Sequence, residues 1–410
     1  MTTVVRRLAE IAADIRIDTL PSDVIDEAKR RLLDSLGSGL GGFHAEPSQI
    51  ARGLAEDLGG NPEATIWGSP HRTSCERATL ANATMLRYLD FMDSHAGSDP
   101  CHPCFNIPPC LAVAERVDAS GRDLIAAFVA GYEIQIRFQD SCRVGPRGWA
   151  SSTYLEFSVP LAVGKLLGLD LDQMTHAAAI SACHSNTLYA LCDGEIPACK
   201  SSADGMTAAT GIVAALLAKR GLDGPLDVIE GKAGFVNAVA HSLDVDRLLA
   251  PATELRVMEV NTKWFNTVRI GQTAVTGVFA IFEANGLGWR DIESLVIHLP
   301  TGEHSSHVGV WDGESRLRPK NRDSANHSPI FSVAVAAVDG ALGPEQYADG
   351  RLVDQDVLGL VDRIRLAPDT QLDPHWPEAS VTRIELTTKD GRHFEETTLY
   401  PPGHSRNRVS

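Results

Sequence analysis

The feature that most constrains this chain is a change of sequence texture near residue 263. Before it, apolar residues recur with the 3.6-residue period of helices, in segments rich in alanine and glycine. After it, short β-branched runs alternate apolar and polar residues, as in SLVIHLP and TRIELTTKDGRHFEETTLYP, the latter with Asp390-Gly391 as a hairpin-turn signal. Small residues let helix axes approach closely, and strands gathered at one end of a chain favour a separate α+β domain. The sequence therefore predicts a mainly α protein with a large all-helical domain and a smaller α+β domain.

The helical part contains five segments with clear periodicity, which begin near Ser22, Asp123, Thr153, Gln173 and Asp204. A further helix, SPIFSVAVAAVDGAL, is predicted among the strands of the second part. We expect a helical domain over residues 1–262 and an α+β domain over residues 263–395. The glycines of GSGLGG lie at a predicted helix end and indicate termination rather than a phosphate-binding loop.

Composition excludes several classes of function. Acidic residues outnumber basic ones by 53 to 37 among 410, and the formal charge of −16 disfavours binding to nucleic acid or an anionic membrane surface. The N-terminus has no secretory pattern, and no stretch approaches the ~20 apolar residues of a membrane span, so a cytoplasmic protein is expected. The eight cysteines are diluted in a large chain, which favours reduced thiols.

One stretch, LDFMDSHAGSDPCHPCFN from Leu89, concentrates residues that carry chemistry. A structural zinc site requires a second spaced pair of Cys or His, and the chain offers no matching motif, so no metal is expected. Cys101 and Cys104 have thioredoxin-like spacing, but redox motifs lie at a helix N-terminus, whereas here the predicted helix precedes the motif. A polar loop that closes a helix with local hydrogen bonds is a third interpretation. Proton transfer is the fourth interpretation of this stretch.

The proton-transfer interpretation gains support from a resemblance that covers nearly the whole chain. The run RYLDFMDSHAGSDPCHP resembles the signature of the MmgE/PrpD family, in which an apolar helix ends in an Asp-Phe pair and a His-Pro follows. Further blocks are similar to those of the family and occur in the expected order: GYEIQIRF, GWASSTY, AVGKLLGLD, AAAISACHSNTL, CKSSADGMTAATGIVAALLAKRGLDGPLDVIEGKAGF, NTKWFNTVRIGQTAV, RDSANHSPIFSVAVAAVDG and YPPGHSRNRVS.

This resemblance implies a helical domain, an α+β lid domain, a C-terminal segment at residues 396–410 that returns towards the helical domain, a homodimer, and a cofactor-independent site between the domains. Members of the family act on small carboxylic acids at a carbon next to a carboxylate, as dehydratases, decarboxylases or epimerases. Such chemistry needs a positioned base, a positioned acid and cations that hold carboxylates.

Four residues are carried over or assigned as catalytic. Asp90 and His102 match the aspartate and the His-Pro histidine of the family, and Lys200 matches the lysine that begins its KSSADG block. His102 and Lys200 would share proton transfer, Asp90 would orient or tune them, and Tyr154 would supply an additional proton. The substrate-binding residues expected from the same blocks and from the polar cluster are Asp93, His95, Ser151, Lys263, Arg269 and Gln272.

The sequence also departs from the methylcitrate dehydratase branch that it otherwise resembles. That branch has Trp-Asp-His where this chain has Trp149-Ala150-Ser151, and a histidine where this chain has Ile270. A cofactor-independent lyase of the hydro-lyase type is the leading hypothesis. The missing histidines suit an isomerase, epimerase or cyclase, which moves a proton without losing water and needs no acid at a leaving hydroxyl. A non-catalytic homologue that only binds its ligand is the third hypothesis.

Overall fold

The computed structural model describes residues 2–97, 99–308 and 318–409, and the chain divides into two compact units. The first comprises Met1–Tyr189 and Cys199–Val260, and the second comprises Ala190–Ala198 and Asn261–Ser410. The division at residue 260 lies close to the change of texture in the sequence. Residues 396–410 are grouped with the second unit, and their expected return towards the helical domain stays a prediction.

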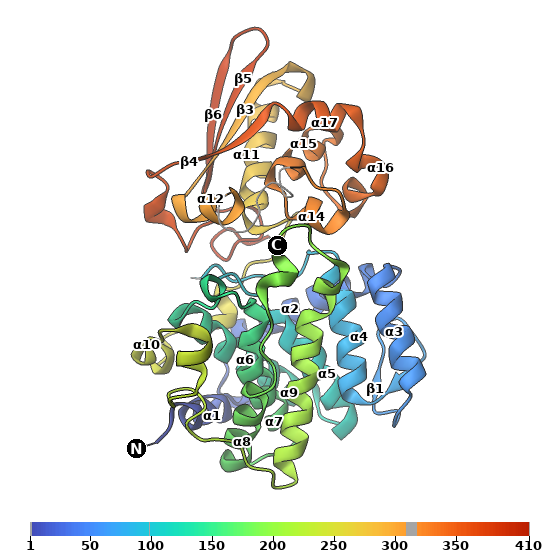
Figure 1. Ribbon diagram of the computed structural model, residues 1–410, viewed down its shortest axis with the longest axis vertical. Helices are drawn as coiled ribbons and strands as arrows, with labels where there is room; N and C mark the ends of the chain where they lie inside the picture. Colours follow the sequence, from blue (N-terminus) through green and yellow to red (C-terminus); the bar gives the residue numbers. More distant parts are fainter. Residues whose placement is uncertain (1, 98, 309–317, 410) are drawn as a thin grey trace. The chain divides into compact units, whose positions relative to one another are not determined.

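The first unit is built almost entirely from helices, as the periodicity predicted (Figure 1). Its α-helices are α1 Val4–Asp14, α2 Ser22–Gly41, α3 Glu46–Leu58, α4 Cys75–Tyr88, α5 Ile107–Val117, α6 Gly121–Ser141, α7 Leu155–Leu166, α8 Leu171–Ala182, α9 Ala203–Lys219 and α10 Val245–Leu249. A short hairpin of β1 (Ala64–Thr65) and β2 (Arg72–Thr73) precedes α4. This hairpin was not predicted, because two-residue strands leave no alternation to detect.

Helix α6 is buried along most of its length and packs on α7, which in turn contacts α8 and α9 (Figure 1). A capping box between Ser120 and Asp123 begins α6, because each residue satisfies a backbone amide of the other. Small residues allow the close packing. A Cβ on Gly211 would lie 2.8 Å from Val159 of α7, and one on Gly205 would lie 3.1 Å from Ala83 of α4. Alanine and glycine in α9 therefore position its N-terminal turn against α4.

The second unit is the predicted α+β part, a four-stranded sheet with helices against it (Figure 1). The strand order is β4-β3-β5-β6, with β3 Ile292–Leu299, β4 Ile364–Pro368, β5 Thr382–Thr388 and β6 His393–Thr398. β3 and β4 pair in parallel and the other pairs are antiparallel. The helices are α11 Arg269–Asn285, α12 Thr301–Val308, α14 Arg322–Asn326, α15 Pro329–Asp339, α16 Asp349–Leu352 and α17 Gln355–Val361. The β5–β6 hairpin turns at the predicted Asp390-Gly391, with Gly391 at φ +85°.

One helical stretch, Ala198–Lys219, has the length and hydropathy that a membrane span requires. However, 61% of its apolar window is buried within the protein, as in the core helix of a soluble protein. The stretch includes α9, whose buried face contributes Ala208, Ile212 and Ala215 to the main core of the first unit.

Candidate active site

The segment Leu89–Asn106 connects α4 to α5, and its shape begins at Asp90. Helix α4 ends at Tyr88, and Asp90 follows with φ +53°, in the left-handed region that few non-glycine residues adopt. The chain then forms a bridge between His95 and Cys101 and enters a 3-10 helix, Pro103–Asn106, that leads into α5. Backbone strain of this kind concentrates at functional sites.

This geometry corrects one expectation. The Cys101–Cys104 motif does lead into a helix, because Pro103 fits the first turn of the 3-10 helix and the two following prolines fit the first turn of α5, where no amide hydrogen is needed. The redox interpretation is nevertheless weakened by burial. Both thiols are fully buried, and burial together with nearby carboxylates raises their pKa well above the usual value. Protonated, buried thiols are poor nucleophiles. All eight cysteines of the chain are free.

Four charged side chains gather where α4 ends and α9 begins: Arg87, Asp90, Lys200 and Asp204. The Arg87 guanidinium pairs with the Asp90 carboxylate and lies 3.4 Å, Nε to Oδ2, from Asp204. Lys200 is only 6% exposed and its charge acts on Asp204. Two cations and two carboxylates thus balance in a buried cluster, which is the condition for keeping charges away from water.

The protonation of Asp204 depends on the other charged groups of this cluster. Burial raises the pKa of Asp204, while the charges of Arg87 and Lys200 oppose the rise and the Asp90 carboxylate adds to it. Sequence reasoning missed both Arg87 and Asp204. The available signal was spacing, since Arg87 lies three residues before Asp90 and Asp204 lies four residues after Lys200.

The Nδ1 of His102 binds the backbone of its own loop. It donates to the backbone carbonyl oxygen of Asp93 over 2.7 Å. The Asp93 side chain is fully buried and turned inward, where Oδ2 accepts from the Tyr132 hydroxyl at 2.7 Å and Oδ1 accepts from the Cys104 amide at 3.0 Å. Asp93 therefore fixes the turn that presents His102, whereas its predicted contact with substrate stays a prediction.

The 3-10 helix that follows His102 contacts α9, the helix that begins shortly after Lys200. The two cysteines that flank His102, Cys101 and Cys104, are both affected by the charges of Asp93 and Asp204. The loop that carries His102 and the first turn of α9 therefore belong to one polar region of the first unit.

Tyr154 is fully buried at the end of a 3-10 helix, Ser151–Tyr154. Its hydroxyl lies 3.1 Å from Asp99 Oδ2 and 3.2 Å from the Cys142 carbonyl oxygen. Asp99 also accepts from the Val144 amide at 2.6 Å. Burial and the Asp99 charge raise the pKa of Tyr154 well above its usual value, so the phenol stays protonated. These contacts hold the loop after α6. Proton donation by Tyr154 stays a prediction. Ser151 is half-buried, and its contact with substrate also stays a prediction.

His95 faces a different group of charges at the end of α6. Its Nε2 lies 3.2 Å from Asp140 Oδ1, and Arg256 and Arg247 lie 3.5 Å and 3.8 Å from Asp140 Oδ2. Burial acts to raise the pKa of Asp140, but the hydrogen bond and charge of His95 and the two arginines outweigh it and lower the pKa. The other ring nitrogen of His95, Nδ1, is buried without a hydrogen-bond partner among the described residues. Contact of His95 with substrate stays a prediction.

The remaining predicted residues, Lys263, Arg269 and Gln272, belong to the second unit. Gln272 binds its own loop, since Oε1 accepts from the Trp264 and Phe265 amides at 3.0 Å each and Nε2 donates to the Phe265 and Thr267 carbonyls. Arg269 pairs with Glu303, and its Nη1 is buried without a partner among the described residues. Lys263 is 5% exposed. Ile270 is buried in the apolar core of this unit.

Two groups of side chains have spacing compatible with metal binding within the described part of the chain: Glu63, Cys75 and Glu76, and His95, Asp140 and Glu259. An arginine already pairs with each group, since Arg116 lies 2.6 Å from Glu63 and Arg256 lies 2.9 Å from Glu259. The guanidinium groups supply positive charge where a cation would bind.

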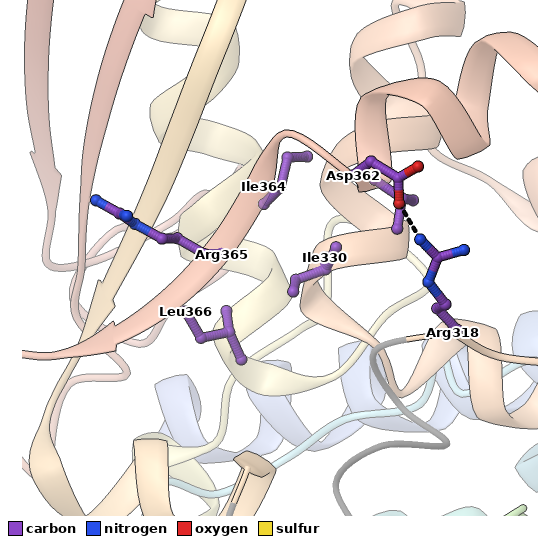
Figure 2. Close-up of a pocket in the computed structure, with 7 residues that line it drawn as sticks. Arg318, Ile330, Asp362, Ile364, Arg365 and Leu366 are labelled. Carbon is purple, nitrogen blue, oxygen red and sulfur yellow. Dashed lines mark hydrogen bonds and ion pairs between the residues drawn. The ribbon is translucent and has the colours of Figure 1, made fainter.

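An open pocket of about 310 Å³ lies in the second unit (Figure 2). It is lined by Arg318, Ile330, Val361, Asp362, Ile364, Arg365 and Leu366, and none of these is a predicted site residue. Arg318 pairs with Asp362, and Arg365 extends away from this pair (Figure 2). The polar groups of the pocket do not converge on one point, so we do not assign a ligand to the pocket.

Comparison with known proteins identifies the family of the chain. A family model for the MmgE/PrpD N-terminal domain matches residues 6–248, and one for the MmgE/PrpD C-terminal domain matches residues 265–410. The chain is 29% identical to cis-aconitate decarboxylase of Homo sapiens, covering 97% of this chain and 83% of that protein. It is 26% identical to 2-methylcitrate dehydratase of Escherichia coli (strain K12), covering 93% and 82%. These relatives are lyases, and the chain belongs to the MmgE/PrpD family, as its motifs predicted.

Proposed function

We propose that this protein is a cofactor-independent lyase of the hydro-lyase type that acts on a small carboxylic acid next to its carboxylate. The proposal is carried by the tautomer of His102, which the Asp93 carbonyl oxygen fixes, together with the buried charge cluster that includes Lys200. A carbonyl oxygen only accepts hydrogen bonds, so Nδ1 of His102 carries the proton and the basic nitrogen is Nε2. A positioned base and a positioned cation of this kind are what proton abstraction α to a carboxylate requires.

In this proposal, His102 Nε2 removes a proton from the carbon next to the carboxylate. Lys200 holds the carboxylate or donates the proton that leaves with the substrate hydroxyl as water, and a carbon–carbon double bond forms. Asp90 tunes these groups through Arg87, with which it pairs.

An isomerase, epimerase or cyclase is the alternative, and one observation favours it. The positions of two histidines in the dehydratase branch are occupied by Ser151 and by Ile270, and the latter is buried among apolar side chains. A reaction that returns the abstracted proton needs no acid at a leaving hydroxyl, so the same His102 site would suffice. A binding homologue without catalysis is the third candidate.

The test is to incubate the protein with 2-methylcitrate, cis-aconitate and related carboxylic acids in heavy water. Loss of water from the substrate supports the hydro-lyase, whereas deuterium at the α carbon without a change of composition supports the isomerase. Thermal stabilisation by an acid that is neither labelled nor converted supports the binding homologue. Inorganic sulfate at equal ionic strength is the control for nonspecific anion effects.

We further propose a cytoplasmic homodimer. The outer face of α9 exposes Met206, Val213 and Leu217, which are 57%, 42% and 38% exposed, with no charged residue between Asp204 and Lys219. Closed two-fold dimers are the commonest oligomers. Light scattering at micromolar concentration tests the assembly, and the variant Val213→Glu tests the face. A monomeric wild type would contradict the proposed dimer. A Val213→Glu variant that stays dimeric would contradict the proposal that this face of α9 forms the interface.

A further inference from the structure

The loop that carries His102 is held by one face of helix α6. Tyr132, Gln135 and Gln139 lie on this face, because residues three and four positions apart in a helix are neighbours on its surface. All three side chains are buried, and each forms a hydrogen bond to the loop of residues 89–106. The helix therefore binds the loop through successive turns.

Gln135 and Gln139 bind the loop on either side of His102. Gln139 Nε2 donates to the His95 carbonyl oxygen over 3.1 Å, and Gln135 Oε1 accepts from Asn106 Nδ2 over 2.7 Å. Gly131 allows the close approach of Asn106, since a Cβ on this glycine would lie 2.5 Å from Asn106 Oδ1. These contacts fix both sides of the loop against α6.

Tyr132 binds the residue that fixes the turn of the loop. Its hydroxyl donates to Asp93 Oδ2 over 2.7 Å, and the Cys104 amide donates to Asp93 Oδ1 over 3.0 Å. Tyr132 and Asp93 are both fully buried. Because the two oxygens accept from two different elements, the carboxyl group cannot rotate without the loss of a buried hydrogen bond, which is costly. The orientation of Asp93 therefore depends on the Tyr132 hydroxyl.

The backbone of Asp93 in turn holds the His102 ring. The carbonyl oxygen of Asp93 accepts from His102 Nδ1 over 2.7 Å. If Asp93 tilts, its carbonyl tilts as well, and Nδ1 loses the acceptor that keeps the hydrogen on this nitrogen. Two hydrogen bonds thus connect the Tyr132 hydroxyl to His102 through a single residue.

We propose that Tyr132 is a positioning residue for the reaction, whose hydroxyl orients Asp93 and thereby keeps the hydrogen of His102 on Nδ1. The inference rests on the proposed function for its effect on catalysis, whereas its effect on the tautomer does not depend on that function. Tyr132 contacts no substrate in this proposal. It acts through Asp93.

The surroundings of Tyr132 keep its hydroxyl a donor. Burial, followed by the charge of Asp93, raises the pKa of Tyr132 well above its usual value, so the phenol stays protonated. The aromatic ring packs near Phe128, with the two ring centroids 6.0 Å apart. Phenylalanine at position 132 would therefore keep the packing of the ring and remove only the hydroxyl.

The first experiment observes the tautomer of His102 by nitrogen NMR in protein with isotope-labelled histidine, at a pH where the ring is neutral. The signals of His102 are those missing from His102→Gln. In the wild type Nδ1 should carry the hydrogen, whereas Tyr132→Phe should show a mixture of the two tautomers. The control is Tyr347→Phe, which changes a fully buried tyrosine of the second unit whose hydroxyl lies 2.8 Å from Ser332 Oγ. This control should keep the wild-type tautomer.

The second experiment measures kcat and KM of the same variants with the acid that reacts best. Tyr132→Phe should lower kcat by up to about 10²-fold, the loss that a small misplacement of a catalytic group can cause. Its KM should change little, because Tyr132 does not contact the substrate, and Tyr347→Phe should keep both constants. Tyr132→Met serves as a second variant without a hydroxyl if Tyr132→Phe does not fold.

Each outcome decides one part of the proposal. A wild type with the hydrogen on Nε2, or a Tyr132 variant with the wild-type tautomer, overturns the role of Tyr132 in holding the ring. A changed tautomer with an unchanged kcat overturns its role in catalysis. If no acid reacts, the proposed function fails, and the NMR experiment still decides whether Tyr132 holds the tautomer of His102.

Discussion

His102 donates its Nδ1 hydrogen to the Asp93 carbonyl oxygen over 2.7 Å, and this single contact determines which nitrogen of the ring is basic. The Asp93 side chain turns the other way and binds Tyr132 and the Cys104 amide, so one residue fixes both the loop and the imidazole. A histidine whose Nδ1 donates in this manner has Nε2 as its accepting nitrogen.

Replacing His102 by glutamine should reduce the chemical step by roughly 10²–10⁴-fold, the usual contribution of positioned proton transfer. The fold should remain, because the ring is only half-buried and an amide can imitate the hydrogen bond from its Nδ1 to the Asp93 carbonyl oxygen. Single-turnover kinetics and circular dichroism measure the two effects. Cys104→Ser is the control, since its thiol is buried and protonated. Loss of activity in Cys104→Ser with a normal His102→Gln would indicate a thiol site instead.

Lys200→Ala should be at least as damaging as His102→Gln, because it removes a proton donor and a cation that holds carboxylate. It also removes the positive charge that lowers the pKa of Asp204, so Asp204 should titrate at a higher pH in the variant. Steady-state kinetics with a partial rescue by Lys200→Arg checks the role of charge. An alanine variant with wild-type kcat/KM would exclude Lys200 from the site.

Arg87→Met should destabilise the protein by about 3–5 kcal/mol, the cost of removing one partner from a buried ion pair. The guanidinium is 8% exposed and serves both Asp90 and Asp204. Arg122→Met is the control, because Arg122 pairs with Asp18 at the surface, where such pairs contribute about 0–1 kcal/mol. Urea unfolding monitored by fluorescence gives both values, and equal losses would mean that the Arg87 cluster is not buried in solution.

Glu156→Gln should make the protein more stable relative to the wild type as the pH rises. Both carboxyl oxygens of Glu156 are buried and lack hydrogen-bond partners among the described residues, and burial raises its pKa well above the usual value. The folded wild type therefore loses stability from a pH of about 4, the unfolded pKa of glutamate, up to the folded pKa. Thermal unfolding at several pH values tests this. The exposed Glu254→Gln should show no such trend, and a flat difference for Glu156→Gln would contradict the buried, protonated carboxyl.

Prolonged chelation should leave the activity unchanged, because arginines already neutralise the two groups with metal-compatible spacing. Elemental analysis of the purified protein is the companion measurement. A stoichiometric metal, or activity lost on chelation and restored by a divalent cation, would overturn the expectation of a metal-independent enzyme.

The sequence by itself determined the class of fold and the family. Periodicity locates a helix near Ser22 and the turn at Asp390-Gly391, because local patterning and turn chemistry act over a few residues. The family motifs likewise pointed to Asp90, His102 and Lys200, because these residues lie inside short recognisable blocks.

Tertiary structure alone decided which side chains work together. Arg87 joins Asp90 to Asp204 across more than 100 residues of sequence, and the Tyr132 hydroxyl donates to Asp93 from 39 residues further along the chain. Burial also decided the state of the cysteines. Cys101 and Cys104 have the spacing of a redox motif, but both thiols are buried and protonated. Charge, burial and hydrogen bonding depend on what surrounds a residue in space, and a single sequence records only its neighbours along the chain.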